Sequence, residues 1–388
     1  MKKILSLVML MALTMCVVDA SAISPVSVQN DTTNALLREQ NLLLREQIAA
    51  LRQQNEILLD HNDSLYDAMA AMQKDMKGTQ KKIDRMPKVG GYMQLLYEYG
   101  KNQDLSSITV KRARLKVSGA LAKNLTYAMQ VEFASPKVLD FYFNYQPWHQ
   151  FGVKAGMFKL PFTIENTVYS PLIVEAIEAP VALAKLVGFN DVCGMKNTGR
   201  DLGINFQGGF FPKGERLILN YDLGVFNGNG VSVTDDNKRK DINARLVVKP
   251  LRSLQLSGAY YWGSYGKDNV TRNRWTAAAC WDNHLILRGE VIGGTTGMAN
   301  QEGLIENVNS LGYYIIGGWH LPKHIDVVAR YDGWQTNMKD KDTRLQDGVI
   351  GLAWNLPHFR AQANYIFTNY YGVKPNNHNF QIMLTGMF

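Results

Sequence analysis

The segment FQIMLTGMF (residues 380–388) carries an apolar side chain at every second position. Phe380, Ile382, Leu384 and Phe388 share one parity, with Gly386 among them. Successive side chains of a β-strand point to opposite faces, so an apolar period of two predicts an amphipathic strand. What such a strand meets on its apolar side decides the class of protein.

The same period of two continues through most of the chain after Val89. In RARLKVSG (112–119) basic side chains alternate with apolar ones, and in LDFYFNY (139–145) Leu139 and alternate aromatic residues lie opposite a mainly polar set. We expect sixteen strands, at residues 89–99, 112–119, 124–133, 139–145, 150–158, 200–209, 215–225, 240–249, 253–262, 272–281, 283–292, 310–320, 324–334, 344–354, 358–368 and 380–388.

The connections between these strands alternate in length. Short turns such as FPKGE and LPKH alternate with longer loops rich in Gly, Asn, Asp and Lys, such as residues 227–240 and 293–309. The brief link near residues 135–136 is an exception. An even strand number, with short turns at one rim and long loops at the other, is typical of a bacterial outer-membrane barrel. We therefore expect residues 88–388 to form an all-β transmembrane barrel of about sixteen antiparallel strands.

The size of this barrel decides which face of each strand meets lipid. Sixteen strands enclose a space too wide for side chains to fill, so the polar face borders water and the apolar face borders lipid. Aromatic residues near strand ends on the apolar face suit the girdles at lipid–water boundaries: these are Trp262, Trp275, Trp281, Trp319, Trp354, Tyr145 and Tyr365. The alternative is a soluble β protein with these rings in its core. Outer-membrane barrels finish on a strand such as 380–388, which their insertion machinery recognises.

Residues 1–22 have the pattern of a secretory signal peptide, with two lysines, an apolar run and small residues at 20–22. A lipoprotein signal through Cys16 is a less favoured alternative, because Met15 is larger than the residue such a site normally has. Beyond the signal, no stretch of about eighteen apolar residues predicts a membrane-spanning helix. We expect the outer membrane of a Gram-negative bacterium as the location.

A heptad repeat occupies residues 30–86, which we expect to form a periplasmic coiled coil. Leucine fills one seam, and asparagine fills most of the other. The leucine seam is Leu37, Leu44, Leu51, Leu58 and Leu65. A solvated single helix is the alternative. Pro87 ends the helical pattern.

Charge and cysteine content restrict the function further. The formal net charge of +8 lies entirely after Pro87. Cys193 and Cys280 remain after signal removal, too few for a disulfide framework, and whether they pair stays open. The sequence has no metal-ligand spacing and no serine-nucleophile motif, so we expect no metal, no cofactor and no enzyme. Export argues against a nucleic-acid partner.

The barrel region resembles the phosphate-selective porin O and P family. The motifs that carry the resemblance are GMFKLPFTIE (156–165), GRDLGINFQG (199–208), LGVFNGNG (223–230) and, more weakly, RYDGW (330–334). The chain departs from the family in EAIEAPVALA (175–184), where a Glu-Arg pair is usual and no arginine occurs. The family's basic ladder for phosphate therefore cannot be placed residue by residue.

The longest connection lies between Lys159 and Arg200 and is partly apolar. The resemblance implies that this third outer loop folds into the lumen and narrows it. The residues that would then line the constriction are Lys159, Glu165, Glu175, Glu178, Lys185 and Arg200. An outer lid or a subunit contact is the alternative.

Basic residues outnumber acidic ones on the polar face of the strands. The basic residues are Arg112, Arg114, Lys116, Lys154, Arg245, Arg274, Arg288, Arg330 and Arg360. The acidic residues are Glu132, Asp140, Asp201, Asp222, Glu290 and Asp332. This excess predicts a mild anion preference. Arg112, Arg114 and Lys116 could form a ladder for phosphate or carboxylate, or could instead pair with Glu132 and Asp140.

The sequence thus predicts an outer-membrane porin for passive diffusion of small polar or anionic solutes, phosphate among them. We expect lipid as its surroundings and a homotrimer, with a dimer left open by the single leucine seam. The rival function is a structural anchor that contacts the cell wall through the coiled coil. A barrel enzyme such as a lipase is a second rival, and no nucleophile with a base supports it.

Overall fold

The computed structural model describes residues 31–83, 86–100, 105–195, 197–231, 233–300, 302–372 and 375–388. The chain divides into two compact units, Met1–Lys81 and Lys82–Phe388. The predicted signal peptide lies outside the described residues. Within them, no helix is both long enough and apolar enough to cross a membrane.

The first unit contains one long helix, α2 (Asp31–Ile83). At about 1.5 Å per residue, its 53 residues extend for about 80 Å. The leucines of the predicted seam are between 51% and 62% exposed along it. The helix is confirmed, while the coiled coil stays a prediction because the structure contains a single chain.

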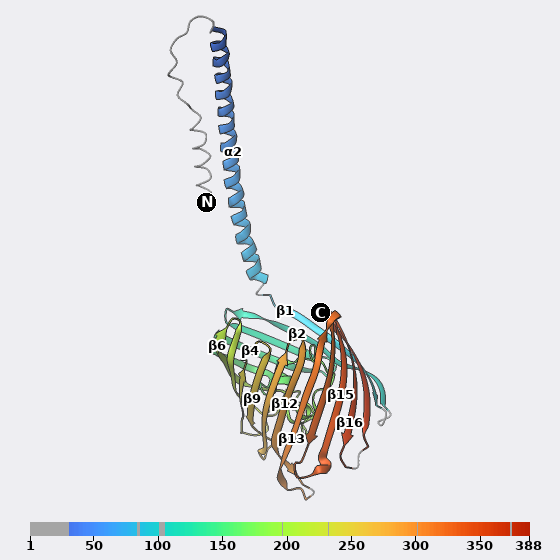
Figure 1. Ribbon diagram of the computed structural model, residues 1–388. Coiled ribbons are helices and arrows are strands. Elements are labelled where there is room, and N and C mark those ends of the chain that lie inside the picture. Colours follow the sequence, from blue (N-terminus) through green and yellow to red (C-terminus); the bar gives the residue numbers. More distant parts are fainter. Residues whose placement is uncertain are drawn as a thin grey trace. The chain divides into compact units, whose positions relative to one another are not determined.

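The second unit is a sheet of antiparallel strands (Figure 1). Its strands are β1 (Lys88–Gly100), β2 (Leu105–Ala122), β3 (Leu125–Glu132), β4 (Lys137–Trp148), β5 (Phe151–Lys159), β6 (Arg200–Lys213), β7 (Arg216–Phe226), β8 (Asp241–Val248), β9 (Leu254–Trp262), β10 (Ser264–Tyr265), β11 (Val270–Asp282), β12 (Leu285–Ala299), β13 (Ile305–Leu321), β14 (Ile325–Gln335), β15 (Arg344–Asn355), β16 (Phe359–Tyr370) and β17 (Asn377–Met387). Strands that follow one another in sequence pair, except that β9 and β10 both pair with β11.

The sheet closes because β17 pairs with β1, Tyr92 opposite Met387 and Gly100 opposite Asn379. The short β10 continues β9 beyond Gly263, and both pair with β11. Because β9 and β10 together occupy one position in the sheet, the 17 strands of the described residues form a barrel of sixteen strands, as predicted. Closure leaves no free sheet edge, which satisfies the backbone in a membrane.

The segment FQIMLTGMF (residues 380–388) shows the orientation of the wall. Phe380, Ile382 and Leu384 are exposed on the outside of β17, whereas Gln381 and Thr385 are buried inside. The predicted girdle residues also point outward, for example Trp319, which is 60% exposed. An apolar outside and a polar inside confirm the membrane barrel rather than a soluble β core.

Two local predictions about the wall are wrong. Residues 293–309 are mostly strand, since β12 runs to Ala299 and β13 begins at Ile305. Leu139 is fully buried rather than exposed to lipid. The register shifts between Gln130 and Val131, so Leu139 has no partner on β3, and such a bulge changes the direction of a side chain.

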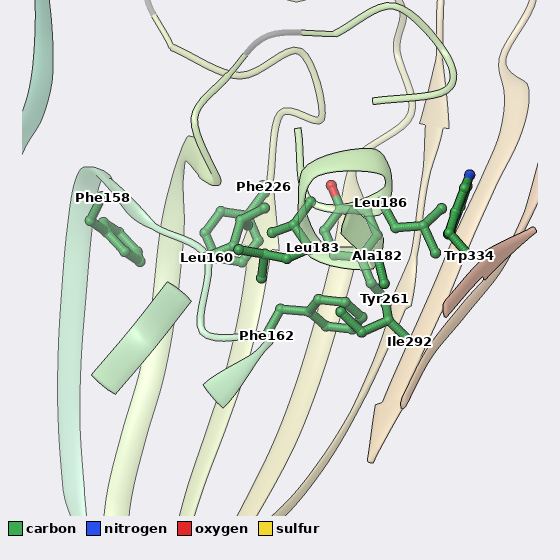
Figure 2. Close-up of a cluster of buried hydrophobic side chains, with 11 residues drawn as sticks. Phe158, Leu160, Phe162, Ala182, Leu183, Leu186, Phe226, Tyr261, Ile292 and Trp334 are labelled. Carbon is green, nitrogen blue, oxygen red and sulfur yellow. The ribbon is translucent and has the colours of Figure 1, made fainter. Parts of the chain in front are cut away.

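The chief apolar cluster lies inside the barrel, on the connection between β5 and β6. This connection, loop L3 (residues 160–199), includes the helices α3 (Ile164–Val168) and α4 (Val181–Leu186). Helix α4 contacts β12, β13 and β14. Figure 2 shows Ala182, Leu183 and Leu186 of α4 among side chains of the loop and the wall. The wall residues of this cluster are Phe158, Phe226, Tyr261, Ile292 and Trp334. L3 is therefore packed into the lumen, and a lid or a subunit contact is not needed to explain its apolar sequence.

Candidate channel constriction

Polar side chains of the wall hold the backbone of L3. Arg360 donates to the carbonyl of Leu172 at 2.8 Å, and Arg330 to that of Glu178 at 2.6 Å. Gln362 donates to the carbonyls of Val174 and Glu175. A buried loop needs such partners because an unpaired backbone group costs free energy comparable to a lost hydrogen bond. We call β11–β16 the anchor wall.

Arg288 on β12 is the central ion-pairing residue of the anchor wall. Its Nε lies 2.8 Å from Glu165 Oε2, and its Nη2 lies 2.6 Å from Glu175 Oε2. Its guanidinium also lies 3.5 Å from the ring centroid of Tyr169. Arg288 is 1% exposed. One buried cation thus joins two acidic residues of L3 to the wall.

The pKa of Glu165 is raised, chiefly by its burial. The positive charge of Arg288 opposes this effect, and the negative charge of Glu175 adds to it. Two carboxylates that share one guanidinium cannot both gain full compensation, so the direction follows from the geometry.

Further ion pairs extend the anchorage along L3. Arg274 Nη2 lies 3.1 Å from Asp191 Oδ1, and its Nε donates to the carbonyl of Leu186. On the other side of the lumen, Lys111 of β2 pairs with Glu178. The acidic residues predicted for the constriction therefore bind cations of the wall and do not project freely into the passage.

The sequence motifs of the family resemblance join the loop bases. Asp201 accepts hydrogen bonds from the backbone N–H groups of Gly228 at 2.9 Å and Gly230 at 3.3 Å. Asn166 donates to the carbonyl of Gly199. Gly228 has a φ of 94°, a conformation that favours glycine. The motifs GRDLGINFQG and LGVFNGNG thus fix where L3 and the next loop leave the wall.

A cavity of about 520 Å³ lies between L3 and the opposite wall. We call it the eyelet cavity, and we call β2–β8 the open wall. The cationic residues that line the eyelet cavity are Arg114, Lys116, Lys154, Lys159, Arg200 and Arg245. Its acidic lining residues are Asp140 and Asp222. Cationic residues therefore dominate this side of the lumen.

The arginines of the eyelet cavity already have carboxylate partners. Arg114 Nε lies 2.7 Å from Glu132, and Arg200 Nε lies 3.0 Å from Asp140. Arg245 lies 3.8 Å from Asp222. Of the two predicted roles for β2, pairing is therefore seen at Arg114, whereas Asp140 pairs with β6 rather than with β2.

The lysines of the eyelet cavity lack such partners. Within the described residues, no carboxylate oxygen lies within 4.0 Å of the Nζ atoms of Lys116, Lys154 or Lys159. Lys154 Nζ lies 4.0 Å from the ring centroid of Tyr142 and 4.7 Å from that of Phe158. Lys159 Nζ donates to the carbonyl of Asn166 at 2.8 Å. The positive charge of the cavity comes mainly from these lysines.

Two further cavities share lining residues with the eyelet cavity. A second cavity of about 70 Å³ shares Arg114, Lys159 and Arg200 with it and adds Arg112, whose Nη1 donates to Gln94. A third cavity of about 320 Å³ shares Lys116 and extends toward the rim that holds Phe388. Arg112, Arg114, Lys159 and Arg200 therefore line the smaller of these two further cavities together with residues of L3.

The structure separates the predicted basic residues into two groups. Arg112, Arg114, Lys116, Lys154, Lys159, Arg200 and Arg245 surround the cavities of the open wall, whereas Arg274, Arg288, Arg330 and Arg360 anchor L3. Lys185 lies on α4, outside the cavity linings described above.

Sequence reasoning missed Lys111 and Asp191 as loop anchors and Tyr142 as a cavity residue. The parity of Tyr142, shared with Asp140 and Asn144, was the available signal. Both cysteines are free, Cys193 near Asp191 and Cys280 near the hydroxyl of Tyr169.

The barrel is closed and sixteen-stranded, with an apolar outside, a polar lumen and a third loop folded inward. These features define an outer-membrane porin, which is a channel rather than an enzyme. The family model for phosphate-selective porin O and P matches residues 89–286, and the chain belongs to this family.

Comparison with solved structures gives the same fold. The chain is similar to an anion-selective porin from Comamonas acidovorans, with 13% identity, a TM-score of 0.61 and coverage of 78% of this chain and 99% of that one. It is similar to OmpF of Salmonella typhi in complex with daunomycin, with 9% identity, a TM-score of 0.57 and coverage of 79% and 98%. It is also similar to the trimer form of OmpT from Vibrio cholerae, with 10% identity, a TM-score of 0.55 and coverage of 78% and 99%. A search of curated protein sequences gives no significant match.

Proposed function

We propose that this porin passes small hydrophilic solutes passively, with a mild preference for anions that includes phosphate. The observation that carries the proposal is the group Lys116, Lys154 and Lys159, whose charges face the eyelet cavity without a carboxylate partner among the described residues. Charged side chains that line a pore bias its selectivity. At about 0.15 M salt the Debye length is about 8 Å, so screening keeps the bias mild.

The reversal potential of the full-length protein in a salt gradient tests this proposal. In a planar lipid bilayer with different KCl concentrations on its two sides, we expect single-channel currents. The reversal potential should be shifted from zero toward the equilibrium potential of chloride. Added phosphate should compete with the chloride current. A potassium-selective reversal potential, or no conductance, would show the proposal to be wrong.

We propose further that the protein is a homotrimer whose helices α2 associate in the periplasm as a coiled coil. The exposed leucine seam of α2 supports association with further copies, since apolar seams of this length are buried between helices. One of the similar barrels, OmpT, forms a trimer. Replacement of Leu44 and Leu51 by Asp should reduce chemical crosslinking between copies, whereas replacement of Glu46 and Gln53, on other positions of the heptad, by Ala should not.

The envelope anchor remains the second function for this helix, because α2 forms a compact unit separate from the barrel. Deletion of residues 30–86 separates the two functions. Unchanged solute flux with loosened attachment of the envelope to the cell wall would assign anchoring to the helix. Reduced flux per barrel would assign the helix to the channel.

A further inference from the structure

The eyelet cavity combines its lysines with apolar surface, and this combination bears on which anions it holds. Tyr142 of β4 is half-buried at the cavity, and the Nζ of Lys154 lies 4.0 Å from its ring centroid. Pro171 and Leu172 of L3 are also half-buried and line the same cavity. A solute in this cavity therefore touches free cations and apolar groups together.

Two of the three guanidinium groups of the cavity, those of Arg200 and Arg114, are poorly placed to bind a further oxyanion in the bidentate manner. Arg200 donates to both carboxylate oxygens of Asp140, to Gln130 and to the carbonyl of Thr198. Arg114 donates to Glu132 through Nε and to the Tyr92 hydroxyl through Nη1. Bidentate binding of phosphate by arginine requires two adjacent free N–H groups. These contacts reduce the structural advantage that inorganic phosphate would have at Arg200 and Arg114.

Apart from Arg245, the remaining cations of the cavity are lysines, which act as point charges. An ammonium group binds a carboxylate without the planar fork geometry of arginine. Lys154 now lies against the rings of Tyr142 and Phe158, a contact that an approaching anion can share. A ring carried by that anion can pack on Tyr142, because aromatic pairs are favourable beyond their buried area. A fully hydrated inorganic anion gains nothing from this surface.

We infer that the eyelet cavity favours organic anions that carry a planar apolar body beside their charge, with small aromatic carboxylates as the ligand class. The inference rests on the proposed function, since the solute must first enter an anion-preferring pore. Lys154 and Lys159 hold the carboxylate, and Tyr142, Pro171 and Leu172 contact the ring. The volume of about 520 Å³ accommodates such a solute together with water.

Channel block by three anions tests the inference. The full-length protein in a planar bilayer carries a chloride current, and benzoate, acetate or phosphate is added at equal concentration and constant ionic strength. We expect benzoate to block at a concentration about fivefold lower than acetate, a ratio set by one aromatic contact. Phosphate should block less strongly than benzoate.

Variants assign the effect to named residues. Tyr142→Leu should remove the difference between benzoate and acetate, whereas Tyr142→Phe should keep it. Lys154→Gln should weaken block by both carboxylates while the open channel still conducts. The matched control is Tyr145→Leu, the same change on the same strand at a residue that is 48% exposed on the outside; it should change neither block.

The possible results separate this inference from the proposed function. Equal block by benzoate and acetate, stronger block by phosphate, or an unchanged ratio in Tyr142→Leu would overturn the inference while an anion-selective reversal potential upholds the porin. A cation-selective reversal potential or an absent current would overturn both.

Discussion

Arg288 on β12 and Lys154 on β5 both project into the lumen, but they have different surroundings. Arg288 binds two carboxylates of L3 and is 1% exposed. Lys154 has ring contacts and, within the described part of the chain, no carboxylate within 4.0 Å. The same strand phase therefore carries a structural cation on one wall and a solute-facing cation on the other.

The difference between the two walls comes from the path of L3. Helix α4 packs on β12, β13 and β14, and this brings the acidic residues and carbonyls of the loop to the arginines of the anchor wall. The space that remains lies beside β2–β8, where Lys116, Lys154 and Lys159 have no carboxylate within 4.0 Å among the described residues. Charge alternation along a strand thus gives the side that faces the lumen, and loop packing decides which charges stay available to solutes.

Replacement of Arg288 by Met should have the largest effect on this arrangement. It leaves Glu165 and Glu175 buried without their cation, and removal of one partner of a buried pair costs about 3–5 kcal/mol. We expect a lower free energy of unfolding in detergent and larger, noisier single-channel currents as L3 loosens. The triple change Arg288→Met, Glu165→Gln and Glu175→Gln removes the uncompensated charges and should recover part of the stability. A single variant as stable as the wild type would contradict the anchoring role.

Replacement of the three lysines of the open wall should change selectivity and leave stability largely intact. A unit charge interacts with an ion 4 Å away by about 1 kcal/mol in water. The variant with Lys116, Lys154 and Lys159 changed to Gln should therefore lose most of its chloride preference in reversal-potential measurements. The control changes Lys213, Lys267 and Lys339 to Gln, exposed residues that alter the net charge equally. Equal shifts in both variants would mean that net charge, rather than the eyelet cavity, sets selectivity.

Much of the barrel could be predicted from the sequence, because the alternation of apolar and polar residues within each strand shows which side chains face outward. The alternation in FQIMLTGMF and RARLKVSG gives the phase of each side chain without knowledge of its partners. The strand number and the lumen-facing set follow from it. Leu139 departs from the pattern because a bulge, which depends on the pairing of two strands, shifts its direction.

The sequence could not show in the same way which basic residues anchor L3 and which line the cavities. Whether Arg288 meets Glu165 or water depends on the three-dimensional path of forty residues of loop, and periodicity carries no information on it. The family resemblance implied that this loop folds into the lumen, but it did not indicate the wall on which the loop packs. The parity of Tyr142 was compatible with the lumen, but its place in the cavity beside Lys154 depends on the pairing of β4 and β5.

The pH dependence of stability tests the balance at Arg288. The pKa of Glu165 is raised by burial, so its ionised form opposes folding at neutral pH. As the pH falls through the raised pKa, protonation removes this cost, and the contribution of Glu165 to stability increases. Relative to Glu165→Gln, the wild type should therefore gain stability as the pH falls from neutral toward the usual titration range of a carboxyl group. A relative loss over this range would mean that the ion pair with Arg288 outweighs burial.

The smallest effect is expected from the hydroxyl of Tyr169. Tyr169→Phe removes a hydrogen bond to Cys280 Sγ at 2.9 Å and keeps the ring against Arg288, so it should cost about 1 kcal/mol or less. Tyr169→Leu also removes the cation–π contact, which is worth up to about 2 kcal/mol when desolvated. In urea unfolding in detergent, the free energy of unfolding should be lower for Tyr169→Leu than for Tyr169→Phe. Equal losses would assign the role of Tyr169 to its hydroxyl, and the anchor wall would then depend on Glu165 and Glu175 alone to hold Arg288.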